Sequence, residues 1–598
     1  MPNRVSNSLP VSHIDKLVRS IAASTLLSAF SLVLLCVVVY IPGLWTLPPV
    51  DRDESRFAQA SRQMFESVAL PAERRDPVLH SGGLAVPMLA DKPRLNKPPM
   101  IYWLQSASAA ALTLGDPLSD KVWHYRVPSL LGAIVSVLVT WRLGARMAGR
   151  TAGMIAGASL AVCPVLAWES HQARADVVLL AATTIAMSAL WRIWTTPNKQ
   201  VLAPLVFWLA LAFGILTKGP VTPMIALLTC VGVSFATRDW KWIARARPLP
   251  GGIILLGAIT PWLVAVAAHV GFGEYANLVI SETLGRGATS REGHWGPPGY
   301  HIALFALLFW PGCLLAVIGV WRAIKSSARV RRQIGASSHI AAAHSDRASV
   351  FLVSWIVPTW IVFEVYATKL PHYTLPVYPA IAILAARALV SATRARWPGP
   401  RSAVAWLGHG VWIVVGCVTS TAPLTITILA SRPAAPPTWL IAVSITVACI
   451  CLILLVIATI RVRAARYANA AVLGVLAIAC SASVLIGAGF PSLPQLWISR
   501  AIVSATPAEA RDQLVVSGYT EDSLVFHTRA SVRFVPPDAA LDWMAENPGS
   551  PIWINESQFS RATLDRINAL AGPPIARASG FNYSKGKQEV LSLYHVPP

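Results

Sequence analysis

The chain has 598 residues, of which 55% are hydrophobic and only 13% are charged. A typical soluble domain carries about 25% charged residues, so the composition argues against a water-soluble enzyme. The net charge of +22 comes from basic residues placed between long apolar runs, which indicates membrane orientation rather than nucleic-acid binding. All eight cysteines lie in apolar runs without a CxxC pair, so we expect neither a disulfide framework nor a cysteine metal site.

Apolar runs long enough to cross a bilayer recur along the chain. About 20 apolar residues in a helix span the hydrocarbon core of about 30 Å. The first run follows Lys16 and Arg19 without a cleavage signal, which predicts an uncleaved membrane helix and a cytoplasmic N-terminus. The chain is predicted to have roughly 13 spans. They are 21–43, 127–147, 151–167, 177–194, 203–217, 220–236, 251–270, 302–321, 349–367, 375–392, 404–430, 438–460 and 468–490.

One further apolar stretch, 98–115, decides the topology. If it lies on the outer surface, the connections rich in Lys and Arg become cytoplasmic, as the positive-inside rule requires. If it spans the membrane, all of them become external. We therefore predict a juxtamembrane helix here, external loops at 44–126 and 271–301, and an external C-terminal region at 491–598.

The polar region 491–598 alternates short β-like runs with helical patterns, which is typical of a small α/β domain. The predicted strands are 513–517, 523–527, 532–535, 551–554 and 589–595, and the predicted helices are 538–546 and 558–571. It holds no dense cluster of ionisable groups that looks catalytic. The sequence thus predicts a transmembrane domain over 1–490, which includes the 44–126 loop, and a C-terminal domain over 491–598.

The first external loop, 44–126, is too long to be a simple connector. Apolar residues at 57, 60, 64, 65 and 68 have the spacing of one helical face, opposite Arg56, Gln59, Arg62, Gln63 and Glu66. We expect this helix to lie flat at the membrane surface, with Asp51, Asp53 and Glu54 at its positive N-terminus. These carboxylates either cap the helix and favour its dipole, or they carry chemistry.

Other ionisable residues stand at the external ends of apolar runs. Lys97 is either an interfacial snorkelling lysine or a ligand-binding group whose direction is fixed by Pro98-Pro99. Asp176 is a helix-terminal carboxylate paired with Arg174 or a site residue, and Lys218 is an interfacial lysine at a turn or a ligand group.

The later part of the chain adds three candidates. Loop 271–301 carries Arg286 and is either a solvated charged loop or a clamp that orders on binding. Glu364 lies inside a span, where a charge is costly, so we expect it to be functional or paired, with Lys369 as its nearest candidate partner. His372 could bind a metal, hydrogen-bond a sugar or be structural.

Five segments together resemble the membrane glycosyltransferases of the protein O-mannosyltransferase superfamily, and among them the bacterial lipid A aminoarabinose transferases. The segments are Asp53-Glu54 with Arg56, Lys97-Pro98-Pro99 followed by Tyr102-Trp103-Leu104, Arg174-Ala175-Asp176, Leu216-Thr217-Lys218-Gly219-Pro220, and the run from Ala367 to Pro376 that contains Lys369-Leu370-Pro371-His372-Tyr373. The resemblance covers most of residues 20–400.

This resemblance implies a polytopic α-helical membrane protein of GT-C type with a small C-terminal periplasmic α/β domain. It implies a catalytic role for the Asp53-Glu54 pair, with Asp53 as the reacting group, and a second acidic role for Asp176. It places Arg56, Lys97 and Lys218 near a carrier phosphate and Tyr373 beside them. From the predicted external positions we add Arg286, with Arg291 as the alternative, and from its possible hydrogen bond to a sugar we add His372, as substrate-binding candidates.

The implied reaction moves a sugar, 4-amino-4-deoxy-L-arabinose, from undecaprenyl phosphate to lipid A or another envelope acceptor at the periplasmic face of the bacterial inner membrane. Membrane lipids are the other implied partners, and no nucleic acid is expected. Such a transfer needs cations that stabilise the departing phosphate, each contributing ~3–4 kcal/mol in a dry site. Asp53 as the single base would contribute ~10²–10⁴-fold, and in-line displacement predicts inversion.

Several alternatives stay open at this point. A protein O-mannosyltransferase or another polyprenyl-phosphate-sugar transferase would use the same machinery. A lipid transporter would explain the spans and the charges within them, but no paired broken helices indicate inverted repeats. Leu95 and Asn96, and the basic segment 70–94, depart from the aminoarabinose transferases, which leaves the sugar open. A divalent metal is the only candidate cofactor.

Overall fold

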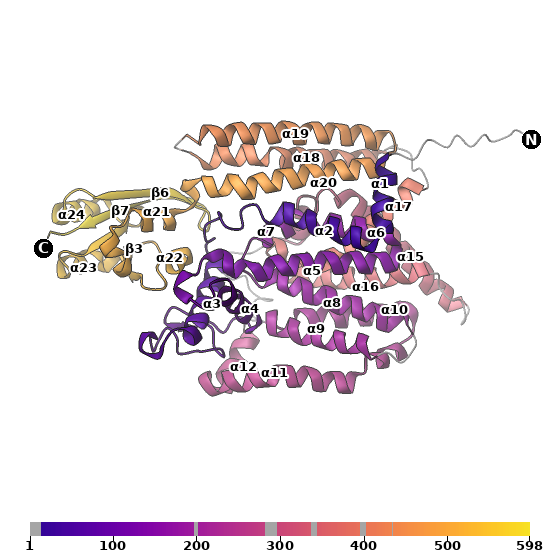
Figure 1. Ribbon diagram of the computed structural model, residues 1–598, viewed down its shortest axis with the longest axis horizontal. Coiled ribbons are helices and arrows are strands. Elements are labelled where there is room, and N and C mark those ends of the chain that lie inside the picture. Colours follow the sequence, from indigo (N-terminus) through magenta and orange to yellow (C-terminus); the bar gives the residue numbers. More distant parts are fainter. Residues whose placement is uncertain are drawn as a thin grey trace, which may run out of the picture.

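The computed structural model describes residues 13–196, 201–281, 296–336, 344–394, 402–432 and 435–597. Long helices run side by side through the body of the molecule, and a mixed α/β unit stands at one end of them (Figure 1). In the described residues, 8 helices are long and apolar enough to cross a bilayer, or up to 9 if the bent pair formed by the first two helices is one span. The chain is therefore a polytopic membrane protein.

Every apolar run predicted to span the membrane is helical, although not every run is one helix. The helices of the body are α1 His13–Ala23, α2 Thr25–Tyr40, α5 Val122–Ala148, α6 Arg150–Ala161, α7 Pro164–Glu169, α8 Asp176–Thr195, α9 Leu202–Lys218, α10 Val221–Thr237, α11 Pro248–Val270, α12 Phe272–Ile280, α14 Tyr300–Leu308, α15 Cys313–Ala336, α16 His344–Val365, α17 Tyr378–Arg394, α18 Ala403–Ala430, α19 Thr438–Arg463 and α20 Tyr467–Val484.

Two of the predicted spans are broken at prolines. Run 151–167 divides into α6 and α7 just before Pro164, and run 302–321 divides into α14 and α15 around Pro311. Proline lacks the backbone N–H that would continue the helix and clashes with the preceding turn. Helices α9 and α10 have 17 residues each, at the lower limit for crossing a bilayer. The total of about 13 spans stays a prediction.

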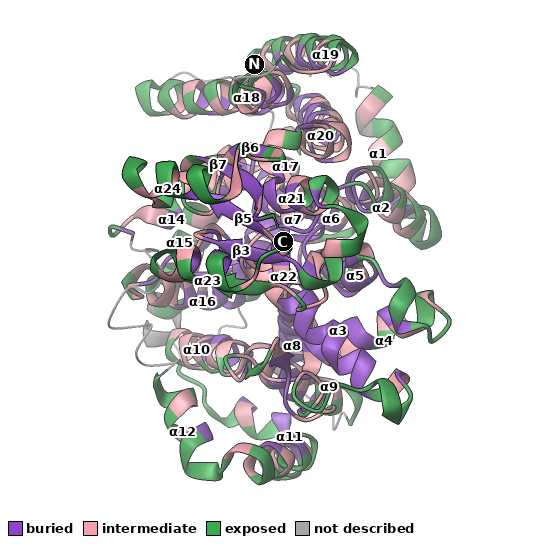
Figure 2. Cartoon of the chain, turned by 90° about the vertical axis from the view of Figure 1, so that its left-hand side faces the viewer, coloured by how far each residue is buried: buried purple, intermediate pink, exposed green. Residues whose placement is uncertain are grey.

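Burial separates central helices from peripheral ones. Among the apolar windows of the candidate spans, 78% of the α8 window and 83% of the window within Pro371–Thr393 are buried, against 11% for α11. Figure 2 shows the same contrast, with exposed residues on α11, α12 and α19 at the edges of the body. Among the candidate spans of the described residues, the two most buried are those that carry Asp176 and His372, so these side chains stand on central segments of the helical body.

The first loop contains helices α3 Asp53–Ala69 and α4 Met100–Leu112 and a short antiparallel pair, β1 Met88–Leu89 with β2 Lys92–Pro93. With 13 residues, α4 is too short to cross a bilayer, as a juxtamembrane helix should be. A helix lying flat at a membrane would keep its polar face in water, but here Gln59, Arg62, Gln63 and Glu66 are all buried. The C-terminal unit and the segment after α3 cover this face. That α3 lies flat at the membrane surface stays a prediction.

The C-terminal unit is a five-stranded mixed sheet flanked by helices. Its strands are β3 Val515–Ser517, β4 Arg533–Val535, β5 Pro551–Asn555, β6 Ala576–Asn582 and β7 Lys587–His595, in the order β4-β3-β5-β7-β6. Strand β3 is parallel to β4 and β5, while β7 is antiparallel to β5 and β6. The helices are α21 Ile498–Ala505, α22 Asp522–His527, α23 Ala540–Glu546 and α24 Arg561–Ala571. Successive residues of β5 pack on opposite sides of the sheet. Trp553 lies in one apolar cluster, while Ile552 and Ile554 lie in another.

One local prediction in this unit was wrong, and one strand was missed. Segment 523–527, expected as a strand, is helix α22, which buries Leu524 and Phe526. Strand β6 was not predicted, because its inward residues include Ala578 and Gly580 and small side chains give a weak alternating signal.

Candidate active site

A small polar cavity of about 70 Å³ lies where α3, α8, α9 and the 3₁₀ segment Pro371–Val377 meet. Seven predicted site residues line it, namely Asp53, Asp176, Arg56, Lys97, Lys218, His372 and Tyr373. They come from five separate parts of the sequence, and the fold brings them together at one cavity. Arg286 and Arg291 lie outside the described residues.

Asp176 is the most heavily paired carboxylate of the cavity. It is the first residue of α8, and its Oδ1 forms an ion pair with Lys218 Nζ. On another side, His372 Nε2 lies 3.6 Å from the same oxygen. Lys218 Nζ also stands 5.2 Å from the centre of the Tyr373 ring, within the range of a cation–π contact. Asp176 is therefore suited to orienting Lys218 and His372 rather than to taking a proton.

Asp53 faces a concentration of positive charge. Burial alone would raise the pKa of its carboxyl, but Arg174, Arg94 and Lys97 outweigh that effect and lower the pKa to about 2, against the opposing influence of Asp176. Asp53 begins α3, where the positive end of the helix dipole also favours a negative charge. Asp53 is thus ionised at neutral pH.

A second group of charges, of which Arg94 lines the cavity while Glu169 and Arg174 do not, was not predicted as part of the site. Glu169, the last residue of α7, has its Oε1 3.3 Å from His372 Nδ1 and 3.4 Å from Arg174. Arg94 donates from Nε to the Tyr102 hydroxyl at 3.2 Å and lies over the Phe57 ring. A carboxylate at the end of an apolar run was the available signal for Glu169, since a charge there is costly unless it is paired.

Glu54 does not line the cavity, although it follows Asp53 directly. Its side chain is fully buried, and its two oxygens accept hydrogen bonds from Arg126 Nε at 2.8 Å and Nη2 at 2.9 Å. The same carboxylate accepts the backbone N–H groups of Val50 and Ala173. Because these contacts join the loop before α3 to α5 and to the segment before α8, the position of Glu54 indicates a structural role instead of the catalytic one expected from the pair.

Glu364 also has partners other than the one expected. Its carboxylate accepts the backbone N–H groups of Gly299, His301 and Ile302 at the start of α14. Lys369, its predicted partner, instead donates to the Gly296 carbonyl at 2.7 Å. Glu364 therefore satisfies the N-terminal donors of a helix, which explains a charge near the end of a span.

A larger apolar groove of about 790 Å³ adjoins the polar cavity. It shares Asn96, Lys97, Asp176, Lys218, His372 and Tyr373 with it. Away from these groups the groove is lined by apolar side chains of α8, α9, α10, α11 and α16, among them Leu179, Ile215, Met224, Leu263 and Phe363. The charged cluster thus stands at one end of an apolar space, an arrangement that fits a molecule with an anionic head and a hydrocarbon tail.

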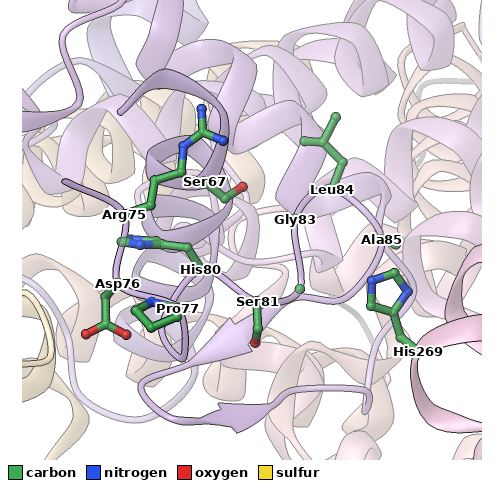
Figure 3. A pocket seen from close by; sticks show the side chains of 11 residues that line it. Ser67, Arg75, Asp76, Pro77, His80, Ser81, Gly83, Leu84, Ala85 and His269 are labelled. Atoms are coloured by element: carbon green, nitrogen blue, oxygen red, sulfur yellow. The ribbon is translucent and has the colours of Figure 1, made fainter. Parts of the chain in front are cut away.

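A third cavity, of about 520 Å³, lies between the 75–85 segment and the end of α11 (Figure 3). Its lining includes Arg75, Asp76, His80 and His269 and none of the predicted site residues. His80 Nε2 lies 3.2 Å from Glu66 on α3. Within the described part of the chain, no group of three or more His, Cys, Asp or Glu residues is arranged to hold a metal ion.

Comparisons with a family model and with solved structures show which proteins this chain is similar to. A family model described as dolichyl-phosphate-mannose-protein mannosyltransferase matches residues 96–264. The structure is similar to the crystal structure of ArnT from Cupriavidus metallidurans bound to undecaprenyl phosphate, with a TM-score of 0.67, 19% identity and coverage of 96% of this chain and 97% of that one. The apo structure of the same protein gives a TM-score of 0.66 at 19% identity, with 97% and 98% of the two chains covered. The chain therefore has a GT-C fold.

Curated relatives are similar in sequence as well. The chain is 26% identical to the undecaprenyl phosphate-alpha-4-amino-4-deoxy-L-arabinose arabinosyl transferase of Enterobacter sp. (strain 638), over 56% of this chain and 54% of that protein. It is 28% identical to the corresponding transferase 1 of Pseudomonas fluorescens, over 58% and 56%. The chain spans about half the length of the curated relatives it matches. The resemblance predicted from the sequence is confirmed.

The structural role of Glu54 makes a testable prediction. Glu54→Gln should lower the free energy of unfolding by about 3–5 kcal/mol, because it leaves the buried Arg126 charge without its partner. Thermal unfolding of the purified protein in detergent, followed by circular dichroism, measures the change. A Glu54→Gln protein that melts like the wild type but has lost transfer would show instead that Glu54 acts in the reaction.

Proposed function

We propose that the protein is an inverting glycosyltransferase that moves a sugar from a polyprenyl-phosphate carrier to an acceptor. The observation that carries this proposal is the cavity in which Asp53 and Asp176 meet Arg56, Lys97 and Lys218 at the end of an apolar groove. A polyprenyl phosphate has the matching parts, a phosphate and a long hydrocarbon chain. The names of the relatives, and the undecaprenyl phosphate bound to ArnT of Cupriavidus metallidurans, support this donor.

In this proposal the donor phosphate lies where the cavity and the groove join. Lys97 and Lys218 line both spaces, and Arg56 lines the cavity beyond them. Lysine supplies a compact charge and arginine a planar fork of donors, so together they hold a phosphate as negative charge builds on it. The hydrocarbon chain occupies the groove beside α9, α11 and α16. This placement makes the carrier phosphate a good leaving group without covalent help from the protein.

Asp53 then acts as the base that accepts the proton of the acceptor hydroxyl. A carboxylate with a pKa of about 2 is a weak base in the free protein, because the surrounding cations stabilise its charged form. A bound phosphate brings negative charge next to Lys97 and Arg94, which offsets their effect and raises the basicity of Asp53. Proton acceptance is thereby favoured only when the donor is in place. With one base and in-line displacement, the configuration at the anomeric carbon inverts.

The sugar and the acceptor proposed are 4-amino-4-deoxy-L-arabinose and lipid A. The names of the curated relatives support the sugar. Transfer of a different sugar to protein is the second candidate, since the matching family model is described as a protein mannosyltransferase. Both candidates use the same carrier-phosphate site and differ in what lies beyond it.

Mass spectrometry of lipid A separates these candidates. Cells that express the chain should contain lipid A with one added aminopentose, and cells without it or with Asp53→Asn should not. Lipid A of identical mass in all three strains would contradict the aminoarabinose assignment.

If Asp53 is the base, Asp53→Asn should act mainly on the transfer rate, whereas Glu54→Gln should act mainly on stability. Asp53→Asn should reduce the transfer rate at saturating donor by ~10²-fold or more, the contribution of a general base. It should cost at most about 2.5 kcal/mol of stability, because a carboxyl whose pKa falls from 3.8 to about 2 on folding contributes about that much at neutral pH. Transfer of a radiolabelled sugar from its undecaprenyl-phosphate donor measures the rate, and an unchanged rate would remove Asp53 from its role.

The lowered pKa of Asp53 also fixes how stability depends on pH. A carboxyl whose pKa falls from 3.8 to about 2 on folding contributes stability above its unfolded pKa and loses it as the pH falls toward 2. The difference in melting temperature between wild type and Asp53→Asn should therefore stay constant from pH 8 to pH 5 and shrink below about pH 4. A difference that disappears between pH 8 and pH 5 would contradict the charge environment described for Asp53.

We further propose that the protein lies in the bacterial inner membrane with a cytoplasmic N-terminus and with α4 and the C-terminal unit on the periplasmic side. A cysteine replacing Leu114, which is 96% exposed just after α4, should react with an impermeant maleimide added to intact spheroplasts. A cysteine replacing the exposed Asp239, in a predicted cytoplasmic connection, should react only after lysis. The reverse pattern would overturn this orientation.

A further inference from the structure

The C-terminal unit reaches the beginning of α3, the helix that supplies two groups of the proposed donor site. Helix α22 presents Asp522, whose Oδ2 accepts a hydrogen bond from Arg56 Nε at 2.8 Å. The next residue, Ser523, donates its backbone N–H to Asp51 at 3.0 Å. On the other side, the Tyr583 hydroxyl accepts the Asp51 N–H at 2.8 Å. The turn that leads into Asp53 is thus bracketed by residues from the far end of the chain.

Asp522 contacts Arg56 from behind the cavity. Arg56 is among the residues that line the cavity, while Asp522 is not. Both side chains are largely buried, with 25% and 18% of their surfaces exposed, so the ion pair is only partly screened by water. The contact with Asp522 engages Nε, one of the five N–H donors of the guanidinium. A partner at Nε sets the plane of the guanidinium, and that plane decides in which direction the other donors point.

We infer that Asp522 is a positioning residue for the donor phosphate, and that the C-terminal unit thereby completes the donor site. The inference rests on the proposed function. Arginine recognises a phosphate through a planar fork, so its affinity depends on orientation more than that of lysine does. An arginine side chain also loses considerable rotamer freedom when it is fixed. A protein partner that already holds Arg56 reduces the entropy lost when the donor binds.

Other contacts between α3 and the C-terminal unit lie away from the cavity and provide a control. Arg62, which lies further along α3, donates hydrogen bonds to Asp120 at 2.7 Å and to the Phe526 carbonyl at 2.6 Å. Arg529 of the C-terminal unit pairs with Asp120 at 2.7 Å and also with Glu66. None of these four side chains lines the cavity. They attach the unit to α3, whereas the Asp522 contact acts on a cavity residue.

The test measures binding and catalysis separately on the full-length protein in nanodiscs. Titration with undecaprenyl phosphate, followed by native mass spectrometry, gives the affinity, and the transfer assay gives kcat and KM for the donor. Asp522→Asn should weaken the affinity about tenfold and raise KM similarly, as loss of a hydrogen bond to a charged group does, with kcat within about twofold of wild type. Asp522→Glu should recover most of the affinity.

Two further variants distinguish positioning from a general structural role. Arg529→Gln breaks a contact of the same unit with α3 but should leave donor affinity unchanged. In an Arg56→Ala background, Asp522→Asn should have no further effect on affinity. Wild-type affinity in Asp522→Asn, an equal loss in Arg529→Gln, or an undiminished effect of Asp522→Asn without Arg56 would each overturn the inference. Failure of the wild-type protein to bind undecaprenyl phosphate would overturn the proposed function and the inference together.

Discussion

The buried ion pair between Glu54 and Arg126 is the interaction on which the rest of the site depends. Arg126, near the start of α5, also donates to the backbone carbonyls of Leu44, Leu47 and Pro48, so one guanidinium holds the whole turn that follows α2. Glu54 in turn accepts the backbone N–H of Ala173, three residues before Asp176. Since Asp53 directly precedes Glu54, a single buried pair sets the relative positions of both cavity carboxylates. Burying two charges is costly, and satisfying nearly all of their hydrogen-bonding atoms offsets that cost.

The two cavity carboxylates lie in different environments, which suit them to different tasks. Asp176 is engaged by Lys218 and lies close to His372, so its charge orients cations. Asp53 lies in the field of several cations, which keeps it ionised until an anionic ligand offsets them. The position of this cluster at the end of an apolar groove matters equally for the proposed function, in which the phosphate of a membrane lipid reaches the charges while its chain stays in an apolar environment.

Much of this arrangement could be predicted from sequence, because it follows from local patterns. The apolar runs predicted the helices, and the short motifs pointed to seven of the residues that line the cavity. Asp53 and Glu54 could not be told apart, since adjacent helical residues point about 100° from each other and only the fold shows which one faces the cavity. The contact between Arg56 and Asp522, and part of the cover over the polar face of α3, come from residues more than 450 positions away. Glu169 was not predicted as a site residue because its partner His372 lies in a distant segment.

The central claim is that the charged cavity holds the phosphate of a polyprenyl carrier whose chain lies in the adjoining groove. A cryo-EM structure of the full-length protein in nanodiscs with undecaprenyl phosphate tests it most directly. We expect the phosphate oxygens within about 3 Å of the Lys97 and Lys218 ammonium groups, with the chain between α9, α11 and α16. A phosphate bound elsewhere, for instance in the cavity beside His80, or a chain lying outside the groove would contradict the account.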